Sequence, residues 1–428
     1  MVADIAKLSV GREEYYTREL ATDHEQYLSG HGESPGRWYG AAASSLGLQG
    51  EASVAGFRAM FEGRDPMTGE LLGRPHGRNA VPAFDVVLRP TKSVSILYGL
   101  GDPWSRSLVL IWEILSRKEE RSRMTTSPIP ATMAAVRLGA PGLDGLTIEV
   151  IQTPQAHAGE ALVEVHAAAL TRDELEWPVD RLPAIPSYEL SGVVVDVADD
   201  VDRVAVGDAV YALTEFDRDG VAAAYAAVPA SLLAPKPSTL DHVESAAIPL
   251  PALSAWQGLF DHGRLNEGQR ALVTGAAGGV GQLATQLARW RGAHVIGVAS
   301  PDGLQAARDL GAHELVDGRG GALEEVDPVD LAFDTVGGDL LRRAGGLVRP
   351  GGRIVSVAEE PQAPGIDAVY FVVEPSSEQL VQITRLVEGG VIRPLIDSVF
   401  PLSDARAAFE RSLARGKRGK IVLRVSGG

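Results

Sequence analysis

A glycine-rich loop is the part of the sequence with the clearest chemistry. Residues 271–281 read ALVTGAAGGVG, and the pattern G-x-G-x-x-G falls on Ala276, Gly278 and Gly281, with alanine in the first place. Small residues let the backbone approach a pyrophosphate, and a following helix N-terminus offers free N–H groups and a positive dipole end. The same pattern also occurs as a strand–helix turn without a ligand. A strand-like segment before the loop and a helix-like segment after it favour a dinucleotide.

The end of the next strand bears on which dinucleotide binds. An acidic residue about 20 residues beyond the loop would bind the ribose 2′-hydroxyl of NAD. The segment GAHVIGVAS ends instead at Ser300, and the next acid, Asp302, lies in a Pro-Asp-Gly turn. A serine tolerates a 2′-phosphate that a carboxylate would repel. We therefore expect NADPH, with NADH as the lesser alternative, although the nearest basic residue downstream is Arg308.

The elements around the loop alternate between strand-like and helix-like segments. From residue 251 on, the strand-like segments are ALVTG, AHVIGVA, HELVD, LAFDTVG and RIVSVA, and the helix-like ones include VGQLATQLARWRG and QAARDLGA. This alternation predicts an α/β fold with a doubly wound parallel sheet. Between 133 and 250, AAVRLG, LTIEVIQTP and GEALVEVHAAAL alternate like short strands broken by Gly and Pro.

Composition narrows the class of protein. The 428 residues are 45% hydrophobic and 22% charged, which fits two to four globular domains and excludes a disordered or fibrous chain. No cysteine is present, so disulfides and thiolate zinc sites are excluded. The sequence has no run of 18 apolar residues and no apolar core near its start. We expect a cytoplasmic protein with no membrane partner.

Charge divides the chain unequally. Residues 1–123 hold 15 basic and 16 acidic side chains, whereas residues 124–428 hold 25 and 40. A nucleic-acid binder needs a basic surface, so we expect no nucleic-acid partner for the longer part. The charge balance of residues 1–123 is close to neutral and does not decide whether that part binds nucleic acid.

Several segments together carry a resemblance to a known family. They are PSYELSGVVVDVADDVDRVAVGDAVYAL, AAIPLPALSAWQGL, GAAGGVGQLATQLA, FDTVGG with LVRPGGRIVSV, and RPLIDSVFPLSDARAAFERSLARGKRGKIVLRV. Over about 133–428 the chain resembles the zinc-free quinone oxidoreductase branch of the medium-chain dehydrogenase/reductase superfamily. The resemblance implies a GroES-like β-barrel domain, 133–250 and 374–428, split around a Rossmann domain, 251–373. The site would lie in the cleft between them.

The resemblance also bears on zinc and on the reaction. Zinc-dependent relatives hold the metal with Cys and His, and the corresponding positions fall near Leu170 and at Tyr188. Neither side chain is a suitable ligand, so we expect no catalytic or structural zinc. Without a Lewis acid, reduction of an electron-poor acceptor is favoured over alcohol oxidation. The implied reaction is hydride transfer from NADPH to a quinone, an enone or a similar activated carbonyl, by a homodimer acting on a small molecule.

The same resemblance places cofactor-contacting residues along the chain. They are Ser254, Ala276, Ala277, Gly278, Gly279, Val280, Gly281, Ser300, Thr335, Val336, Val357, Ala358, Phe371 and Val372. Tyr188 takes the metal-ligand position and is the candidate for substrate contact or proton delivery. It could equally be a packing aromatic between the domains. Asp173 is a second catalytic candidate, with a structural hydrogen-bond role as the alternative.

The N-terminal part has a different origin. Paired tyrosines, such as Tyr15 and Tyr16, are usually residues of an amphipathic helix. Residues 1–103, however, resemble the start of a MobF (TrwC-like) conjugative relaxase, an enzyme that nicks DNA through a tyrosine nucleophile. The matching positions are Tyr15 or Tyr16 for the nucleophile, Tyr27 for the second tyrosine and Asp85 for the assisting acid. The family's three metal-binding histidines do not follow. We therefore interpret 1–105 as a truncated α+β relaxase-like fragment without nicking activity, and 106–132 as a junction.

Three functions remain as alternatives. The first is the NADPH-dependent oxidoreductase, and the second is a DNA-nicking relaxase, which the missing histidine cluster opposes. The third is a cofactor-binding protein with little turnover, which shares the glycine loop and which only an assay separates from the first.

Overall fold

The computed structural model describes residues 3–7, 84–88, 92–96, 129–177 and 180–425. The chain divides into two compact units, 1–125 and 126–428, and each is described by itself. The boundary falls inside the segment 106–132 that we expected as a junction. The further division of the second unit at 250 and 373 stays a prediction.

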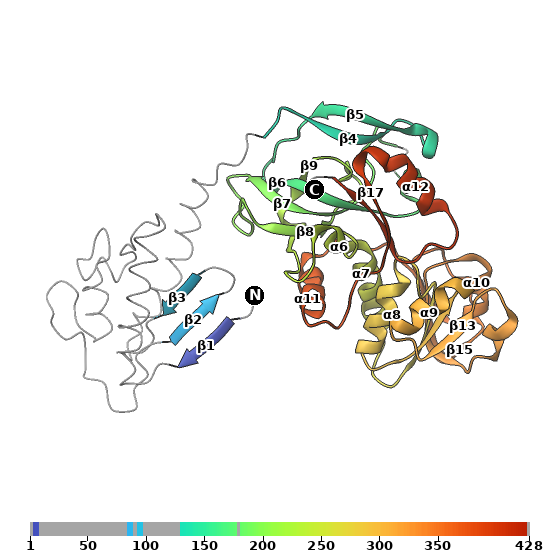
Figure 1. Cartoon of the computed structure of the whole chain (residues 1–428). Coiled ribbons are helices and arrows are strands. Elements are labelled where there is room, and N and C mark those ends of the chain that lie inside the picture. Colours follow the sequence, from blue (N-terminus) through green and yellow to red (C-terminus); the bar gives the residue numbers. More distant parts are fainter. Residues whose placement is uncertain (1–2, 8–83, 89–91, 97–128, 178–179, 426–428) are drawn as a thin grey trace, which may run out of the picture. The chain divides into compact units, whose positions relative to one another are not determined.

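The described part of the first unit is a small antiparallel sheet of three strands. They are β1 (Ala3–Lys7), β2 (Phe84–Leu88) and β3 (Lys92–Ile96), in the order β1-β2-β3 (Figure 1). Asp85 lies on β2, in register with Ala6 and Ser95. Tyr15, Tyr16 and Tyr27 lie outside the described residues.

A largely antiparallel sheet forms one half of the second unit. Its strand order is β10-β8-β7-β6-β18-β17, with β9 also paired to β6, so the end of the chain returns beside strands from its middle (Figure 1). The strands are β6 (Glu160–Leu170), β7 (Glu189–Val197), β8 (Ala209–Leu213), β9 (Tyr225–Pro229), β10 (Ala234–Pro235), β17 (Ile396–Pro401) and β18 (Lys420–Arg424). A hairpin of β4 (Thr132–Leu138) and β5 (Leu146–Gln152) accompanies them. This agrees with the expected GroES-like half.

A parallel sheet of six strands forms the other half. Its order is β13-β12-β11-β14-β15-β16, so the direction of winding reverses between β11 and β14. The strands are β11 (Arg270–Thr274), β12 (His294–Ala299), β13 (Glu314–Asp317), β14 (Val329–Asp334), β15 (Val348–Ser356) and β16 (Asp367–Tyr370). In such a sheet, ligands bind at the carboxyl ends of the strands where the winding reverses. The expected doubly wound fold is confirmed.

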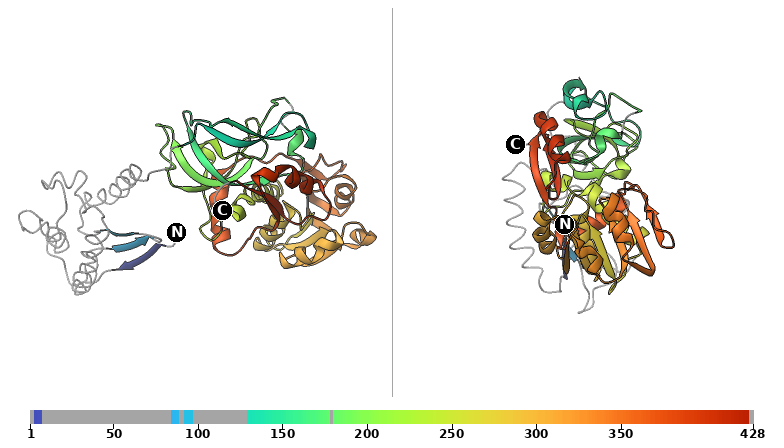
Figure 2. Two further views of the ribbon diagram at one scale, coloured as in Figure 1. Left: turned by 45° about the horizontal axis from the view of Figure 1, so that its top comes forward. Right: turned by 90° about the vertical axis from the view of Figure 1, so that its right-hand side faces the viewer.

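Helices cover the parallel sheet and connect it to the other half (Figure 2). Those associated with the parallel sheet are α8 (Gly281–Trp290), α9 (Leu304–Asp309) and α10 (Gly338–Gly345). The others are α6 (His242–Ala246), α7 (Pro249–Trp256), its π-helical continuation η6 (Gln257–His262), α11 (Ser377–Glu388) and α12 (Ala405–Leu413). On α8 the apolar residues recur at helical spacing and are buried, as an amphipathic helix against a sheet requires.

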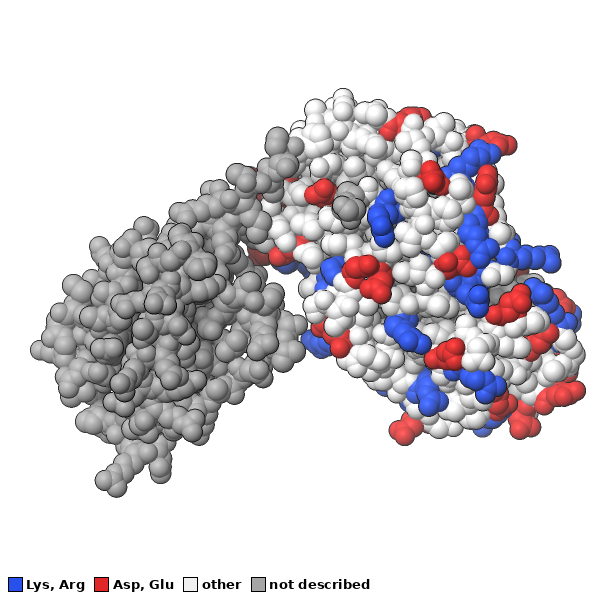
Figure 3. Space-filling view, in the orientation of Figure 1, with Lys and Arg blue, Asp and Glu red and all other residues white. Residues whose placement is uncertain are grey.

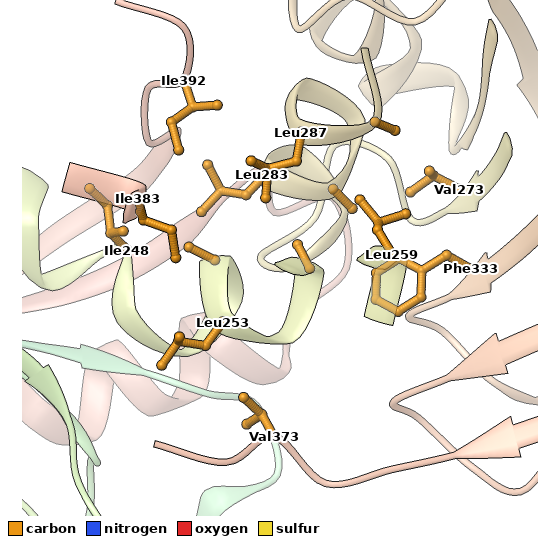
Figure 4. Close-up of a cluster of buried hydrophobic side chains, with 14 of the residues drawn as sticks. Ile248, Leu253, Leu259, Val273, Leu283, Leu287, Phe333, Val373, Ile383 and Ile392 are labelled. Atoms are coloured by element: carbon orange, nitrogen blue, oxygen red, sulfur yellow. The ribbon is translucent and has the colours of Figure 1, made fainter. Parts of the chain in front are cut away.

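One buried apolar cluster connects the two halves of the second unit. Figure 4 labels ten of its members, which come from both sides: Ile248, Leu253, Leu259, Val273, Leu283, Leu287, Phe333, Val373, Ile383 and Ile392. The same cluster includes Tyr211 and Leu213 of β8 in the antiparallel sheet. The two halves therefore share a core.

The surface of the second unit carries mixed charge. On the face shown in Figure 3, acidic and basic side chains are interspersed. Within the described ranges, we find no helix that combines the length and apolar character needed to span a bilayer.

Candidate functional site

The glycine loop begins with a residue that must be glycine. Gly275 follows β11 with φ of 64°, in the left-handed region. A Cβ there would lie 2.7 Å from Thr335 Oγ1 and 2.9 Å from Val336 Cγ2. Gly275 is not among the residues predicted from the sequence, although its place at the end of a strand in TGAAGG is a usable signal. The Gly278 N–H then donates to the Gly275 carbonyl at 2.7 Å, which turns the chain toward α8.

The start of α8 leaves no room for a side chain at Gly281 and little room at Gly278. A Cβ on Gly281 would lie 2.1 Å from the Gly275 carbonyl oxygen. A Cβ on Gly278 would lie 3.1 Å from the same oxygen. The loop therefore presents bare backbone and a helix N-terminus at the carboxyl end of β11. That arrangement fits the pyrophosphate of a nicotinamide dinucleotide.

A buried aspartate ties together the strand ends beneath the crevice. Asp334 ends β14 and is fully buried, and its carboxylate accepts hydrogen bonds from Thr274 Oγ1 at 2.6 Å and Ser356 Oγ at 2.9 Å. It also accepts the Gly337 N–H at 2.9 Å. The carboxyl ends of β11, β14 and β15 are thus held in one register. We had not singled out Asp334, although it ends a strand in the segment LAFDTVG.

The expected cofactor residues lie around this edge of the sheet. Ser300 follows β12 and is half-buried, and Thr335 bonds through its N–H and hydroxyl to Thr274. After β15, the Val357 N–H donates to the Asp334 carbonyl at 3.1 Å, and Ala358 N–H donates to Ser356 Oγ at 3.1 Å. These residues follow the ends of strands β12, β14 and β15, as expected for a ligand-binding crevice where the winding of the sheet reverses. Their contact with a cofactor stays a prediction.

Three other expected cofactor residues differ in exposure. Ser254 is buried within α7, at 2% exposed. Phe371 is buried and its ring packs on His262, with centroids 4.4 Å apart. Val372, the next residue, is 60% exposed. Phe371 thus packs in the core and Val372 faces solvent, and contact of either residue with a cofactor stays a prediction.

Tyr188 lies in a buried aromatic cluster. Its side chain is 1% exposed, and its ring centroid lies 5.8 Å from that of Trp177 and 5.2 Å from that of Phe216. Arg181 Nη2 donates a hydrogen bond to the Tyr188 hydroxyl at 3.4 Å and another to the Phe216 carbonyl. Burial raises the pKa of the Tyr188 hydroxyl, and the Arg181 guanidinium opposes that rise. The hydroxyl therefore keeps its proton at neutral pH.

A buried ion pair includes Glu189, the residue that follows Tyr188 in the sequence. Glu189 is 1% exposed and Lys420 is 5% exposed, and their charged groups are in direct contact. Lys420 Nζ also donates to Thr171 Oγ1 at 3.0 Å, and the Leu250 N–H donates to Glu189 Oε2 at 3.1 Å. This pair joins β7 to β18, which are 231 residues apart in the sequence. Sequence reasoning missed it because neither residue belongs to a local motif.

A second buried acid lies beside this pair. Glu174 is 1% exposed, and one of its oxygens, Oε2, accepts the Thr171 N–H at 3.1 Å. The other oxygen is buried and has no hydrogen-bond partner among the described residues. Burial raises the pKa of Glu174 to about 8, against the opposing charge of Lys420. Asp173, the expected candidate, has a carboxylate 74% exposed and 3.8 Å from Arg172 Nε.

The described side chains can be compared with the ligand set that zinc requires. Across 129–177 and 180–425, no group of three or more His, Cys, Asp or Glu gathers closely enough to hold a metal ion. The positions that the resemblance aligns with zinc ligands hold Leu170 and Tyr188, and the sequence has no cysteine. Zinc in proteins is bound by Cys, His and carboxylates. The donor set here does not fit that metal.

Family models match three parts of the chain. A model described as "Alcohol dehydrogenase GroES-like domain" matches residues 157–238. One described as "Zinc-binding dehydrogenase" matches 310–423. A third, "TrwC relaxase", matches 10–113 and confirms the resemblance of the N-terminal part.

Whole-chain comparisons find relatives for the second unit. A "Probable zinc-binding oxidoreductase, mitochondrial" from Arthroderma benhamiae is 32% identical over 330 residues, which are 70% of this chain and 99% of the relative. An "NADPH-dependent alkenal/one oxidoreductase, chloroplastic" from Arabidopsis thaliana is 32% identical over 66% of this chain and 76% of the relative. The structure of a quinone oxidoreductase from Coxiella burnetii matches with a TM-score of 0.66 and 28% identity, covering 69% of this chain and all of that one.

Proposed function

Since the chain belongs to the medium-chain dehydrogenase/reductase superfamily and is an NAD(P)H-dependent oxidoreductase, we propose that it reduces activated carbonyl acceptors with NADPH and without zinc. The acceptor is a quinone, an enone or a carbonyl of similar electron deficiency. The observation that carries this proposal is the residue at the metal-ligand position, Tyr188, which is buried among aromatic rings with Arg181 bonded to its hydroxyl.

The proposed class of acceptor follows from the absence of zinc-ligand side chains at the metal-ligand position, which holds Tyr188. Oxidation of an alcohol requires stabilisation of a developing alkoxide, which a zinc ion supplies in metal-dependent enzymes. Bound NADPH supplies a hydride, and an electron-poor acceptor takes it with less electrostatic help. The chain itself must hold the acceptor, exclude water and deliver one proton. The names of the Arabidopsis and Coxiella proteins support this class of acceptor.

Tyr188 is the proposed proton donor. Because Arg181 donates to its oxygen, the hydroxyl keeps its own hydrogen for an acceptor. The guanidinium would stabilise the phenolate left behind after the proton moves. Asp173 keeps a lesser role as a candidate, since its carboxylate is exposed. Ser300 at the end of β12 supports the preference for NADPH over NADH.

The test is NADPH oxidation by the full-length protein against a panel of quinones and enones, with metal content measured on the same preparation. We expect turnover that survives a chelator and a protein that holds far less than one zinc per chain. Tyr188→Phe should lower turnover with enones, whose reduction needs a proton, and leave NADPH affinity unchanged. Absence of both turnover and an NADPH-induced thermal shift would refute the enzyme, and zinc-dependent activity would refute the zinc-free mechanism.

The N-terminal part supports no second activity in this chain. The relaxase model matches 10–113, but the family's three histidines that hold the metal beside the scissile phosphate do not follow in the sequence. We predict no covalent tyrosine–DNA adduct. The cytoplasm as compartment and the homodimer as assembly remain predictions, and the third alternative, a binding protein with little turnover, is decided by the same assay.

A further inference from the structure

Two glutamines of α8 bind the chain where it enters the antiparallel sheet. After β16 the chain leaves the parallel sheet, forms α11, and passes α8 at residues 393–395 before β17 begins at Ile396. Gln286 Nε2 donates to the Arg393 carbonyl at 2.9 Å, and the Arg393 N–H donates back to Gln286 Oε1 at 3.0 Å. Gln282 does the same with Leu395, donating to its carbonyl at 3.2 Å and accepting its N–H.

The spacing of these bonds matches a helix to a strand. Gln282 and Gln286 are four residues apart on α8, so their positions are separated by about 6 Å along the helix axis. Residues 393 and 395 are two apart in an extended segment, and their separation is about 6.6 Å. Residues i and i+2 of such a segment present their N–H and C=O groups to the same side, and the residue between them, Pro394, has no N–H. The two amides thus take the place of a neighbouring strand.

This amide ladder, defined as Gln282 and Gln286 with the main chain of 393–395, is buried. Gln282 is fully buried and Gln286 is 7% exposed. A buried amide left without its partners is costly, so these four hydrogen bonds specify one register between α8 and the incoming strand. The Lys420 N–H also donates to the Leu395 carbonyl at 2.9 Å, which extends the ladder to the first residue of β18.

The ladder reaches the phosphate loop itself. Gln282 directly follows Gly281, the first residue of α8, and the Gly419 N–H donates to the Ala277 carbonyl at 2.9 Å. Gly419 has φ of 77°, and a Cβ there would lie 1.8 Å from the Leu395 carbonyl oxygen. The loop, the helix start and the returning strands therefore form one hydrogen-bonded assembly. Hydride transfer requires that the cofactor and the acceptor side be held in fixed mutual geometry.

We propose that Gln282 and Gln286 are positioning residues for hydride transfer, because their amide ladder fixes the pyrophosphate-binding start of α8 to the strands that carry the acceptor side of the site. A third buried glutamine acts in the same way at the earlier exit from the parallel sheet. Gln257 Nε2 donates to the Glu374 carbonyl at 2.8 Å and its Oε1 accepts the Glu374 N–H at 3.0 Å. Both ends of the connection from β16 to β17 are thus bound by a glutamine.

The test compares the full-length protein with Gln282→Met/Gln286→Met, which keeps side-chain length and removes the amides. The matched control is Gln305→Met on α9, where an exposed glutamine bonds only to Asp309 in the described part of the chain. Hydrogen–deuterium exchange of peptides covering 391–396 is measured without cofactor. NADPH affinity is measured by calorimetry, and hydride transfer is measured in a single turnover with the best acceptor of the panel.

We expect the double variant to exchange the Arg393 and Leu395 amides at least tenfold faster, to bind NADPH roughly tenfold more weakly and to transfer hydride roughly ten- to a hundredfold more slowly. Gln305→Met should match the wild type within twofold in each measurement. If the double variant does not fold, Gln286→Met alone is measured, with smaller changes of the same direction expected.

Two results would overturn the proposal. One is unchanged exchange at 391–396 in a folded double variant. The other is faster exchange with a lowered melting temperature but unchanged NADPH affinity and hydride-transfer rate, which is the signature of a purely structural role. The hydride-transfer measurement rests on the proposed function, whereas the hydrogen–deuterium exchange and NADPH-affinity measurements do not. Failure of every acceptor would therefore count against the function, and the ladder would still be judged by exchange and affinity.

Discussion

Removing the Lys420 ammonium should be among the most damaging single changes in the second unit. The ammonium contacts the Glu189 carboxylate and Thr171 Oγ1, and both charged residues are almost fully buried. In Lys420→Met the carboxylate would keep, among the described residues, only the Leu250 N–H and the Thr171 hydroxyl as donors. Deleting one partner of a buried ion pair leaves an uncompensated charge and costs about 3–5 kcal/mol. For a unit of this size that corresponds to a fall of about 6–10 °C in melting temperature.

The stability lost in Lys420→Met should increase with pH. Burial raises the pKa of Glu189, and Lys420 is the main group that opposes the rise. Without Lys420 the folded-state pKa of Glu189 rises further above its unfolded value, so the variant gains stability when that carboxyl is protonated. The contribution is fully present below the unfolded pKa near 4.5 and is lost as pH increases. The deficit of Lys420→Met should therefore be small near pH 5 and larger at pH 8.

Calorimetric melting at pH 5, 7 and 8 measures this deficit in a double-mutant cycle with Glu189→Gln. We expect Lys420→Met/Glu189→Gln to cost less than the two single variants summed, by about 2 kcal/mol or more. Arg424→Met is the matched control, because Arg424 is exposed at the end of the same strand. Additive losses, or a Lys420→Met deficit that stays constant from pH 5 to 8, would refute the interpretation of the pair as a coupled buried charge.

Three further changes test neighbouring parts of the site. Glu174→Gln should gain stability relative to the wild type as pH rises from about 5 to 8. With a folded-state pKa of about 8, folded Glu174 keeps its proton over that window whereas the unfolded chain loses it, so the wild type is progressively destabilised; melting curves across pH show it. Ser300→Asp should weaken NADPH binding at least tenfold and spare NADH, measured by titration of both cofactors. Gly281→Ala should abolish cofactor binding, since its Cβ would lie 2.1 Å from the Gly275 carbonyl oxygen, whereas Gly279→Ala, whose Cβ would meet Lys420 Cδ at 3.4 Å, should be tolerated.

Local pattern was enough to predict the elements around the glycine loop. Strand alternation and helical spacing depend on neighbouring residues, so β11, α8 and β12 were predicted in the right order. The doubly wound parallel sheet followed from the same alternation and is confirmed, while the order of its strands was not predicted. Apart from Ser254 in α7, the candidate cofactor residues, which the resemblance placed, follow the ends of parallel strands. The burial of individual residues within a segment was harder to predict. Phe371 is buried and Val372 is exposed, and this difference depends on the packing of Phe371 on His262.

Long-range pairs could not be predicted from one sequence. Glu189 and Lys420 are 231 residues apart, and neither composition nor periodicity relates them. The glutamines of α8 show the same limit, because Gln282 and Gln286 look like ordinary helix residues until residues 393–395 pass beside them. In the loop at 171–176, the sequence favoured Asp173, but the fold buries Glu174 instead. Choosing between adjacent acids requires knowledge of which side of the turn faces the core.

The start of β18 contributes both to the stability of the second unit and to the proposed site. Gly419 binds the glycine loop through its backbone, and the Lys420 side chain contacts Glu189, the residue that follows Tyr188 in the sequence. A change that displaces this strand must therefore disturb both the phosphate cradle and the surroundings of the proposed proton donor. Lys420→Met should accordingly weaken NADPH binding at pH 8, where the deficit is largest, and recover affinity near pH 5. A stability loss without any change in NADPH affinity would show that the two ends of this segment act independently.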